Sequence, residues 1–569
     1  MGWGILSRID NVDRPELSEP SPDPLHAPLR PEHDIPRFVL LTTPASLLLT
    51  DVLRLSLPRF PRDLSLALPI SSPLPFTMRA FPLILAVTCA LAHLTATHAA
   101  TAPLRAGAAT SNLTPELGSL IVGGFAPFPA QDVHDELQAR CLVLDDGHTK
   151  LALVVCDLIG LHRGVSVEAR RLIAETSGIP PENVMISSTH THSAATALGA
   201  SRFAFEQPLD DYQRFVARRI ADGVRRAANL LRPAHIAFGR VEAPEHVFNR
   251  RWHMREGTVP LSPFGKVERV KMNPPAGSKD LVAPAGPTDP TVSFIALREP
   301  GGRPISVLAA YSLHYVGGVA GRAISADYFG VFCEELKRLQ AVADDGPPFV
   351  ALLANGTSGD INNINFRSAE PRRPAYEKMR LVGRDVAAKV HGALAAATWR
   401  DTASLAARYR EPAIAWRTIG PELLAWAQET EARAPRLASG DIPVGARWAT
   451  TPDWVQRLSY AGRVQHLAAS GSPAKIPLQV LRIGEVCIGT TPCETFAEMG
   501  LEFKRRSPFA ASFLIELNHG YFGYLPTPRH FELGGYETWP GTNYLEPQAS
   551  VKMLDALLEM AGELRPAAP

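Results

Sequence analysis

The 569-residue sequence has almost no net charge, few cysteines and little apolar sequence in long runs, and each shortage excludes a class of protein. Its 58 basic and 57 acidic side chains nearly cancel, so bulk charge gives no attraction to nucleic acid. We therefore expect no nucleic-acid partner. Hydrophobic residues at 46% and charged residues at 20% are instead ordinary for a soluble globular enzyme.

The six cysteines are scattered and show no CxxC spacing. Cys89 lies in a segment that we assign below to a signal peptide, and the five cysteines that remain cannot all pair. The spacing therefore indicates neither a disulfide framework nor a zinc–thiolate cluster. We expect buried, unpaired thiols.

The apolar run from Phe81 to Leu94 is too short to span a bilayer. It follows Met78 and a basic residue, and it precedes a small-residue site, which is the order found in secretory signal peptides. The alternative is a buried helix. We interpret residues 78–99 as a signal peptide.

On this interpretation the protein starts at Met78, and residues 1–77 are a non-native or disordered upstream extension. No later segment is long and apolar enough to cross a bilayer. We therefore expect a secreted or periplasmic protein that has at most peripheral membrane contact.

Residues 100–569 alternate short apolar runs with longer amphipathic ones, the pattern of helices packed on a sheet. We predict one large α/β domain with a mixed or parallel central sheet flanked by helices and with the active site at the carboxyl ends of the strands. The predicted strands are 151–160, 183–188, 291–297, 304–313, 349–354 and 513–517. The predicted helices are 166–178, 210–231, 325–340 and a closing helix within 545–564.

Three further segments complete this outline. The Pro- and Gly-rich stretch 262–290 predicts a long ordered loop. Residues 411–470 are expected to be helical, and 476–492 read as a hairpin that returns to the core. The sequence shows no internal repeat.

Two histidines directly follow the apolar strand in NVMISSTHTHSAA. His190 and His192 stand at positions i and i+2, so in an extended backbone their imidazoles share one side. Neutral imidazole is a good zinc ligand, and the pair therefore suggests a metal site. The alternative is a loop with two solvated histidines.

Other polar residues follow other predicted strands. His314 follows PISVLAAYSL, Asn355 to Asp360 follow FVALLA, Glu494 follows VCIGTTPC, and Tyr524 comes shortly after FLIEL. Because ligands bind at the carboxyl edge of strands in open α/β sheets, we expect these groups to converge.

Several of these segments resemble successive motifs of the neutral, non-lysosomal ceramidase family. They are NVMISSTHTHS, FNRRW, the His314 segment, NGTSGDINN, TPCETFAEMG, NHGYFGYLPT and GGYE. The similarity runs in matching order from Leu104 to Leu564 and covers the catalytic, N-terminal part of that family. The agreement of many motifs in order is far more specific than any one of them.

The resemblance implies a site built around one catalytic zinc ion. It makes His190, His314, Glu494 and Tyr524 the zinc ligands. It also makes His192, Arg250 and Tyr536 the residues that contact the scissile amide and its developing oxyanion. Such a zinc ion lowers the pKa of a bound water to about 7, so the implied reaction is attack of that water on an N-acyl amide carbonyl, in a sphingolipid or another N-acyl lipid.

The sequence also departs from the family pattern. The family's GDVSPN reads GDINN here, which places Asn362 at the position of a serine associated with ceramidase activity. Cys493 replaces the preferred Gly before Glu494, and two alanines replace Gly and Pro after the histidine motif. We also expect the family's C-terminal sandwich domain to be absent. These departures leave the zinc site in place and call ceramide itself into question as the substrate.

Three functions remain open at this point. The first is an exported zinc-dependent hydrolase of linear amides. The second is a metal-dependent hydrolase of an ester or cyclic amide, because a His-x-His motif after a strand also begins amidohydrolase and metallo-β-lactamase sites. The third is an exported metal- or lipid-binding homologue without turnover, which the loss of the family serine favours. The oligomeric state is not indicated.

Overall fold

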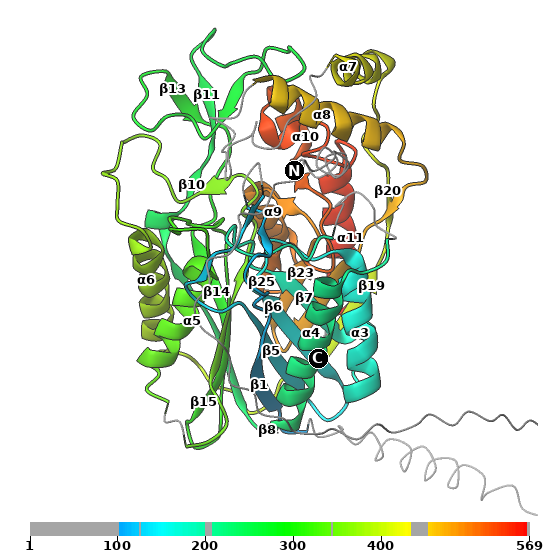
Figure 1. Ribbon diagram of the computed structural model, residues 1–569. Coiled ribbons are helices and arrows are strands. Elements are labelled where there is room, and N and C mark those ends of the chain that lie inside the picture. Colours follow the sequence, from blue (N-terminus) through cyan, green and yellow to red (C-terminus); the bar gives the residue numbers. More distant parts are fainter. Residues whose placement is uncertain (1–101, 124–126, 200–206, 343–344, 434–452, 566–569) are drawn as a thin grey trace, which may run out of the picture. The chain divides into compact units, whose positions relative to one another are not determined.

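The computed structural model describes residues 102–565, apart from 124–126, 200–206, 343–344 and 434–452. The expected upstream extension (1–77) and signal peptide (78–99) lie outside the described residues. The predicted mixed α/β class is confirmed, but the strands form several mixed sheets instead of one central sheet (Figure 1).

Three large sheets share one topology within the described part of the chain. Their strand orders are β7-β6-β5-β1-β8, β17-β15-β14-β9 and β25-β23-β22-β19. In each sheet, two consecutive strands form an antiparallel hairpin. An earlier strand pairs antiparallel with the first strand of the hairpin. After a helix, a further strand pairs parallel with the second strand of the hairpin. A second helix then follows. We call these units the first, second and third repeats.

The first repeat contains β1 (Arg105–Asn112), β5 (Gln138–Asp145), β6 (Lys150–Cys156), α3 (Arg163–Ser177), β7 (Val184–Ser188) and α4 (Asp211–Asn229). The second contains β9 (His235–Glu242), β14 (Thr291–Arg298), β15 (Pro304–Tyr311), α5 (Asp327–Leu339), β17 (Val350–Asn355) and α6 (Glu377–Leu394). The third contains β19 (Leu405–Arg410), β22 (Leu478–Ile483), β23 (Val486–Thr490), α9 (Ala497–Arg506), β25 (Ala511–Ile515) and α11 (Ala549–Glu563).

The predicted strands and helices therefore exist, and the predicted hairpin is β22–β23. The expectation that there is no internal repeat is wrong at the level of topology. A repeat of this kind requires only the same order of elements and the same apolar faces. The three units therefore need not share similar sequences, and no such similarity is visible.

The inner faces of the three large sheets pack together in one core. This core takes alternate residues from each sheet, for example Leu153 of β6, Leu308 of β15 and Ile488 of β23. The other face of each sheet is covered by its own helices: α3 and α4 in the first repeat, α5 and α6 in the second, α9 and α11 in the third. Because both faces are buried, these strands read as nearly continuous apolar runs.

The helices carry the features that such packing requires. Helix α4 places its apolar residues on one face against β1 and β5. It begins with a capping box in which Asp210 accepts from the Gln213 amide and Gln213 accepts from the Asp210 amide, which satisfies donors that the first turn leaves unpaired.

The parallel strands of the three repeats end at one place. The Ser188 amide donates to the Leu517 carbonyl (3.2 Å), and the Glu516 amide donates to the Asn355 carbonyl (3.1 Å). The Asn355 side-chain amide donates to the Thr189 carbonyl (3.3 Å). The exits of β7, β17 and β25 are thus joined directly, as expected if their side chains are to converge.

Smaller elements surround this end of the sheets. Short ones include β2 (Leu120–Ile121), β10 (Phe248–Asn249), β18 (Ile361–Asn362), β20 (Ala413–Ile414), β24 (Glu494–Thr495), β26 (Tyr524–Leu525), α10 (Pro528–Leu533) and η4 (Tyr536–Thr538). The loop predicted at 262–290 is wrong in part, because β12 (Val270–Met272) and β13 (Leu281–Pro284) pair with β11 (Arg251–Met254). Its Pro and Gly residues favour a loop in a sequence-based prediction, although Pro is compatible with short edge strands such as these two.

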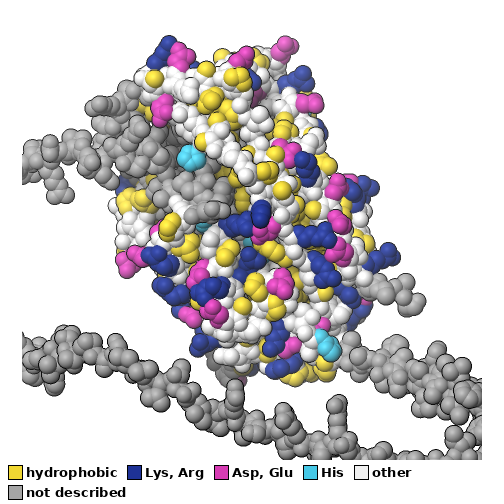
Figure 2. Space-filling view, turned by 90° about the vertical axis from the view of Figure 1, so that its right-hand side faces the viewer, with side chains coloured by type: hydrophobic (Ala, Val, Ile, Leu, Met, Phe, Trp, Pro, Cys, Tyr) yellow, Lys and Arg dark blue, Asp and Glu magenta, His cyan; other side chains and the backbone are white. Residues whose placement is uncertain are grey.

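Other expectations can be compared directly. The predicted helical stretch contains α7 (Pro421–Ala432) and α8 (Asp453–Ala468). The five cysteines are buried and unpaired, as expected. None of the helices in the described residues has the length and hydropathy needed to cross a membrane. Basic and acidic side chains are interspersed over the face in Figure 2, as the balanced composition suggests.

Candidate active site

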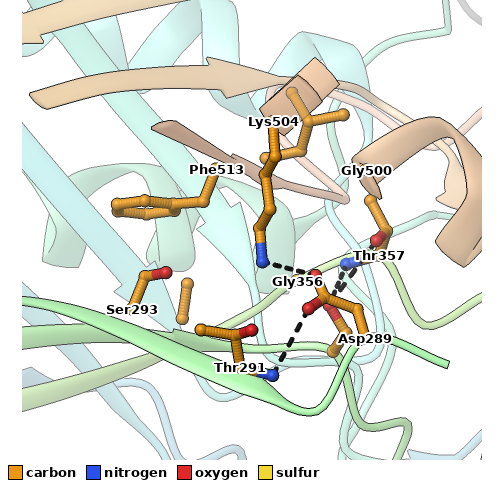
Figure 3. Close-up of a pocket in the computed structure, with 11 residues that line it drawn as sticks. Asp289, Thr291, Ser293, Gly356, Thr357, Gly500, Lys504 and Phe513 are labelled. Atoms are coloured by element: carbon orange, nitrogen blue, oxygen red, sulfur yellow. Dashed lines mark hydrogen bonds and ion pairs between the residues drawn. The ribbon is translucent and has the colours of Figure 1, made fainter. Parts of the chain in front are cut away.

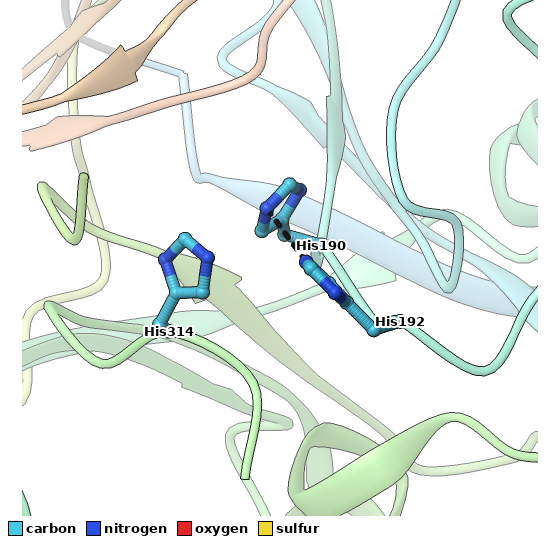
Figure 4. Close-up of side chains that lie close together, drawn as sticks. All are labelled: His190, His192 and His314. Atoms are coloured by element: carbon cyan, nitrogen blue, oxygen red, sulfur yellow. Dashed lines mark hydrogen bonds between the residues drawn. The ribbon is translucent and has the colours of Figure 1, made fainter. Parts of the chain in front are cut away.

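A cluster of three histidines lies where the strand exits meet. The ligand nitrogens of His190, His192 and His314 all lie within 4.8 Å of one another. His190 and His192 follow β7 of the first repeat, and His314 follows β15 of the second, so the structure joins two distant segments of the chain (Figure 4). The Nε2 atoms of His190 and His192 are 3.1 Å apart.

The third repeat supplies a carboxylate to the same cluster. Glu494 follows β23, and its Oε2 lies 3.3 Å from His190 Nε2 and 3.7 Å from His314 Nε2. The other oxygen, Oε1, accepts a hydrogen bond from the Tyr521 hydroxyl at 2.7 Å. Both histidines and Glu494 are almost completely buried.

Hydrogen bonds fix which nitrogen of each imidazole carries the proton. Nδ1 of His190 lies 2.7 Å from the Ile159 carbonyl and Nδ1 of His192 lies 2.7 Å from the Gly123 carbonyl. Nδ1 of His314 lies 3.1 Å from the Ser358 carbonyl. Because a carbonyl can only accept, each Nδ1 donates, and each neutral ring keeps its lone pair on Nε2.

The electrostatics favour neutral rings for His192 and His314 and an ionised carboxylate for Glu494. Burial is the main cause that lowers the pKa of His192 and of His314 well below their usual value, and the proximity of His190 adds to it. Burial by itself would raise the pKa of Glu494, but its contacts with His190 and the Tyr521 hydroxyl outweigh that and lower it. Neutral imidazole and carboxylate are the forms that bind zinc.

This set of donors fits a divalent cation. Ligands held at about 2.0–2.2 Å around a tetrahedral zinc ion lie about 3.3 Å apart. Glu494 Oε2 lies at a similar distance from His190 Nε2 (3.3 Å) and somewhat further from His314 Nε2 (3.7 Å). His314 Nε2 and Glu494 Oε2 are buried and have no hydrogen-bond partner among the described residues. Four acceptors facing one another are unfavourable unless a cation lies between them.

The backbone at His190 differs from the extended conformation that the sequence suggested. Its φ is 72°, in the left-handed region that non-glycine residues rarely adopt and that is found at functional sites. Its amide donates to the Leu158 carbonyl (2.9 Å). The turn directs His190 toward His314 while His192, two residues later, stacks on Tyr315 with ring centroids 3.7 Å apart.

Tyr524 and Arg250 lie beside this cluster. Strand β24 pairs with β26 so that Glu494 stands opposite Tyr524. Burial raises the pKa of Tyr524 well above its usual value, Arg250 lowers it and Glu494 raises it, which places the phenol between a cation and a carboxylate. The Arg250 guanidinium lies 5.2 Å from the centre of the Tyr524 ring.

Arg250 is buried and is one of two arginines that share an acid. Its Nε donates to Glu537 at 2.8 Å, and Arg251 Nη1 donates to the other oxygen of Glu537 at 2.5 Å. Arg250 Nη2 is buried without a hydrogen-bond partner among the described residues. Arg250 is therefore not a surface cation, and one of its donors is unused.

Tyr536 and Asn362 stand further out. The ring of Tyr536 meets that of Tyr524 edge to face at 5.8 Å, and burial raises its pKa, so both phenols are hydrogen-bond donors. Asn362 ends β18; its side chain donates to Asn273 (3.0 Å) and accepts from the Asn363 amide (2.7 Å). It contacts none of the three histidines by a hydrogen bond.

The sequence analysis missed the residues that support the cluster. Tyr521 binds Glu494, and Ser358 lies between His314 and a buried carboxyl, Glu516 (Ser358 Oγ to Glu516 Oε1, 2.7 Å). Burial raises the pKa of Glu516 well above its usual value. Tyr521 and Glu516 stand at the same strand exit as Tyr524, and this shared position is the sequence signal that points to them.

One small cavity and one other side-chain cluster among the described residues are less suitable. A cavity of about 10 Å³ behind the His314 loop holds no more than a water molecule, and the ion pair of Lys504 with Asp289 (2.6 Å) borders it (Figure 3). A second group with one histidine, Glu245, His246 and Asp385, is already paired with Lys389, which lies 2.6 Å from Glu245 and 3.8 Å from Asp385.

The fold and the site together define a class of protein. It is an α/β protein in which three histidines and one carboxylate form a cluster at the ends of strands from three repeats. This geometry is suited to a metal-dependent enzyme. No protein-family model matches the chain. A neutral ceramidase from Pseudomonas aeruginosa is 23% identical over 516 residues, which cover 82% of this chain and 73% of the relative.

Two solved structures share the fold. One, a ceramidase complexed with C2, superposes with a TM-score of 0.58 at 18% identity, covering 82% of this chain and 77% of the other. The other, neutral ceramidase from Pseudomonas aeruginosa, gives a TM-score of 0.57 at 18% identity, covering 82% and 76%. The resemblance to the neutral ceramidases that the motifs indicated is thereby confirmed.

Proposed function

We propose that this chain is an exported, zinc-dependent hydrolase of N-acyl amides, with a lipid or other small molecule as substrate. One observation carries the proposal. Three Nε2 lone pairs, from His190, His192 and His314, converge with Glu494 Oε2, and each ring is held in that tautomer by a carbonyl. The similarity to the neutral ceramidases supports the choice of an amide bond.

In this proposal His190, His314, Glu494 and Tyr524 hold the ion. Zinc bound there supplies a Lewis acid that polarises a carbonyl and makes water a stronger acid. Glu494 brings a negative charge, and Tyr521 fixes the carboxylate by binding its other oxygen, which leaves Oε2 for the metal.

His192 moves the proton. Its Nδ1 proton is committed to the Gly123 carbonyl, so Nε2 is free to accept a proton from the attacking water. The same nitrogen then returns that proton to the amine that leaves when the C–N bond breaks. Stacking on Tyr315 holds the ring in place.

Arg250 and Tyr536 stabilise the negative charge that develops on the carbonyl oxygen. Arg250 Nη2 is an unused buried donor, and the Tyr536 phenol remains protonated because burial raises its pKa. One well-placed donor of this kind contributes about 3–4 kcal/mol to the transition state.

Metal analysis of the purified chain combined with hydrolysis assays tests this function. We expect about one zinc ion per chain, release of fatty acid from N-acyl amides of some chain length, and loss of that activity on chelation with recovery when zinc is added. Zinc with turnover only of esters or cyclic amides would favour the second function. Zinc without any turnover would favour a binding protein, and a chain without zinc would refute the enzyme.

The position of Asn362 gives a prediction about substrate choice. Replacing it by serine restores the hydroxyl that the resembled family carries there, and we expect Asn362→Ser to raise kcat/KM for fatty-acyl amides. The comparison is with Asn273→Ser, which alters the hydrogen-bond partner of Asn362 without supplying a hydroxyl at that position. An equal or lower rate in Asn362→Ser would show that the residue does not decide the substrate.

Export is part of the same proposal. It depends on residues 78–99, whose sequence has the order of a signal peptide.

A further inference from the structure

Glu516 lies at the junction of the three repeats, one hydrogen bond away from a residue that contacts His314. It is fully buried, and it follows β25 at the point where the exits of β7 and β17 meet. Its backbone amide donates to Asn355, and Asn355 donates in turn to Thr189, the residue before His190. Glu516 contacts none of the histidines itself.

Both oxygens of Glu516 are used by groups next to metal-competent residues. Oε1 accepts from the Ser358 hydroxyl (2.7 Å), and Oε2 accepts from the Thr495 amide (2.6 Å). Ser358 also contacts His314 Nδ1 through its hydroxyl (3.2 Å) and its carbonyl (3.1 Å). Thr495 is the neighbour of Glu494 along the chain.

The direction of these hydrogen bonds determines their effect. Because the Ser358 hydroxyl gives its hydrogen to Glu516, it can only accept from His314. His314 therefore keeps its proton on Nδ1, and its Nε2 lone pair lies 3.7 Å from Glu494 Oε2, where both can face one ion. The Ser358 carbonyl also accepts from Nδ1, so the carboxyl adds a second constraint on the same tautomer. Without the carboxyl, the hydroxyl is free to turn and compete with that hydrogen bond by donating to Nδ1.

We propose that Glu516 and Ser358 are positioning residues for the metal site: together they fix the tautomer of His314, and Glu516 also fixes the segment that carries Glu494. A ligating histidine that donates its other N–H to such a chain binds metal more tightly, and loss of the partner costs about 10–100-fold in affinity. This inference depends on the proposed function, because it concerns the affinity of the same site for zinc.

Zinc affinity of the full chain, measured by competition with a chelator, tests the proposal. Glu516→Gln is expected to weaken zinc binding about 10–100-fold. Ser358→Ala keeps the Ser358 carbonyl as a partner of His314 Nδ1, so its effect is expected at the lower end of that range, about tenfold. Glu516→Gln should have the larger effect, because the amide group of glutamine places a donor opposite either the Ser358 hydroxyl or the Thr495 amide. The visible absorption spectrum of the cobalt-substituted protein is expected to change in both variants, since it reports ligand geometry.

The chain offers a matched control. Ser166 makes a similar buried contact with a different histidine, His519 (2.8 Å), which is not in the cluster. Ser166→Ala removes a buried serine–histidine hydrogen bond of the same kind and is expected to leave the zinc affinity within about threefold of the unchanged protein, well short of what loss of a supporting partner costs.

The outcomes are distinguishable. Zinc affinity within threefold of the unchanged protein in Ser358→Ala, with an unaltered cobalt spectrum, would overturn the inference alone. An equal loss in Ser166→Ala would also overturn it, because the effect would then be general destabilisation. An unchanged protein that binds no zinc would overturn the proposed function and this inference together. If Glu516→Gln does not fold, Ser358→Ala decides the question by the same measurement.

Discussion

Replacing His314 or His190 by alanine is expected to remove most of the bound zinc and nearly all hydrolytic activity. Loss of a supporting partner alone costs about 10–100-fold in metal affinity, so loss of a ligand should cost more. The remaining groups would also face one another without the cation that balances them. Metal content after dialysis and chelator competition measure the effect.

The control for this prediction is His246→Ala. His246 is buried like the other two, and it belongs to the group with Glu245 and Asp385, where its Nε2 lies 2.8 Å from Asp385. Because that group is separate from the cluster of His190, His192 and His314, the variant should retain its zinc. Stoichiometric zinc in His314→Ala or His190→Ala would contradict the assignment of the ligands.

Replacing Glu537 by glutamine is expected to lower the free energy of unfolding by about 3–5 kcal/mol, because it leaves two buried arginines without their shared acid. Arg250 and Arg251 both pair with Glu537, and all three side chains are at most 5% exposed. The measurement is denaturant-induced unfolding. Activity should fall as well, because Arg250 loses the partner that fixes its orientation.

The matched variant is Glu502→Gln on the surface. Glu502 pairs with Arg505 at 2.6 Å, but both side chains are at least 36% exposed, so its loss should change stability by about 1 kcal/mol or less. A similar small change for Glu537→Gln would show that the buried arginines do not depend on this acid.

Sequence reasoning placed the strands and the order of the site motifs because both depend on local pattern. The strands 151–160, 304–313 and 349–354 were visible as apolar runs because both faces of each sheet are buried. The convergence of His190, His314 and Glu494 followed from one rule, that residues after strands meet at the carboxyl edge.

What was missed depends on pairing and direction, which local pattern does not encode. The division into three sheets depends on which hairpin packs against which, and a strand such as β19 looks the same in any of them. Ser358 lies in a motif that was noted for Asn362, and Glu516 lies in a segment that was predicted as a strand. Their proposed role depends on the direction of a hydrogen bond, which the sequence does not reveal. The turn at His190 was missed because its residue type predicts no positive φ.

The proposed ion would have a structural effect, because its ligands come from three repeats. His190, His314 and Glu494 each come from a different repeat, so an ion bound to all three would link the repeats as a cross-link does, and could bind only after all three had docked. Zinc would then stabilise the whole chain, by about 2.7 kcal/mol at a free concentration 100 times its Kd. Outside the cell, the lifetime of such a protein against proteases would follow the supply of zinc around it.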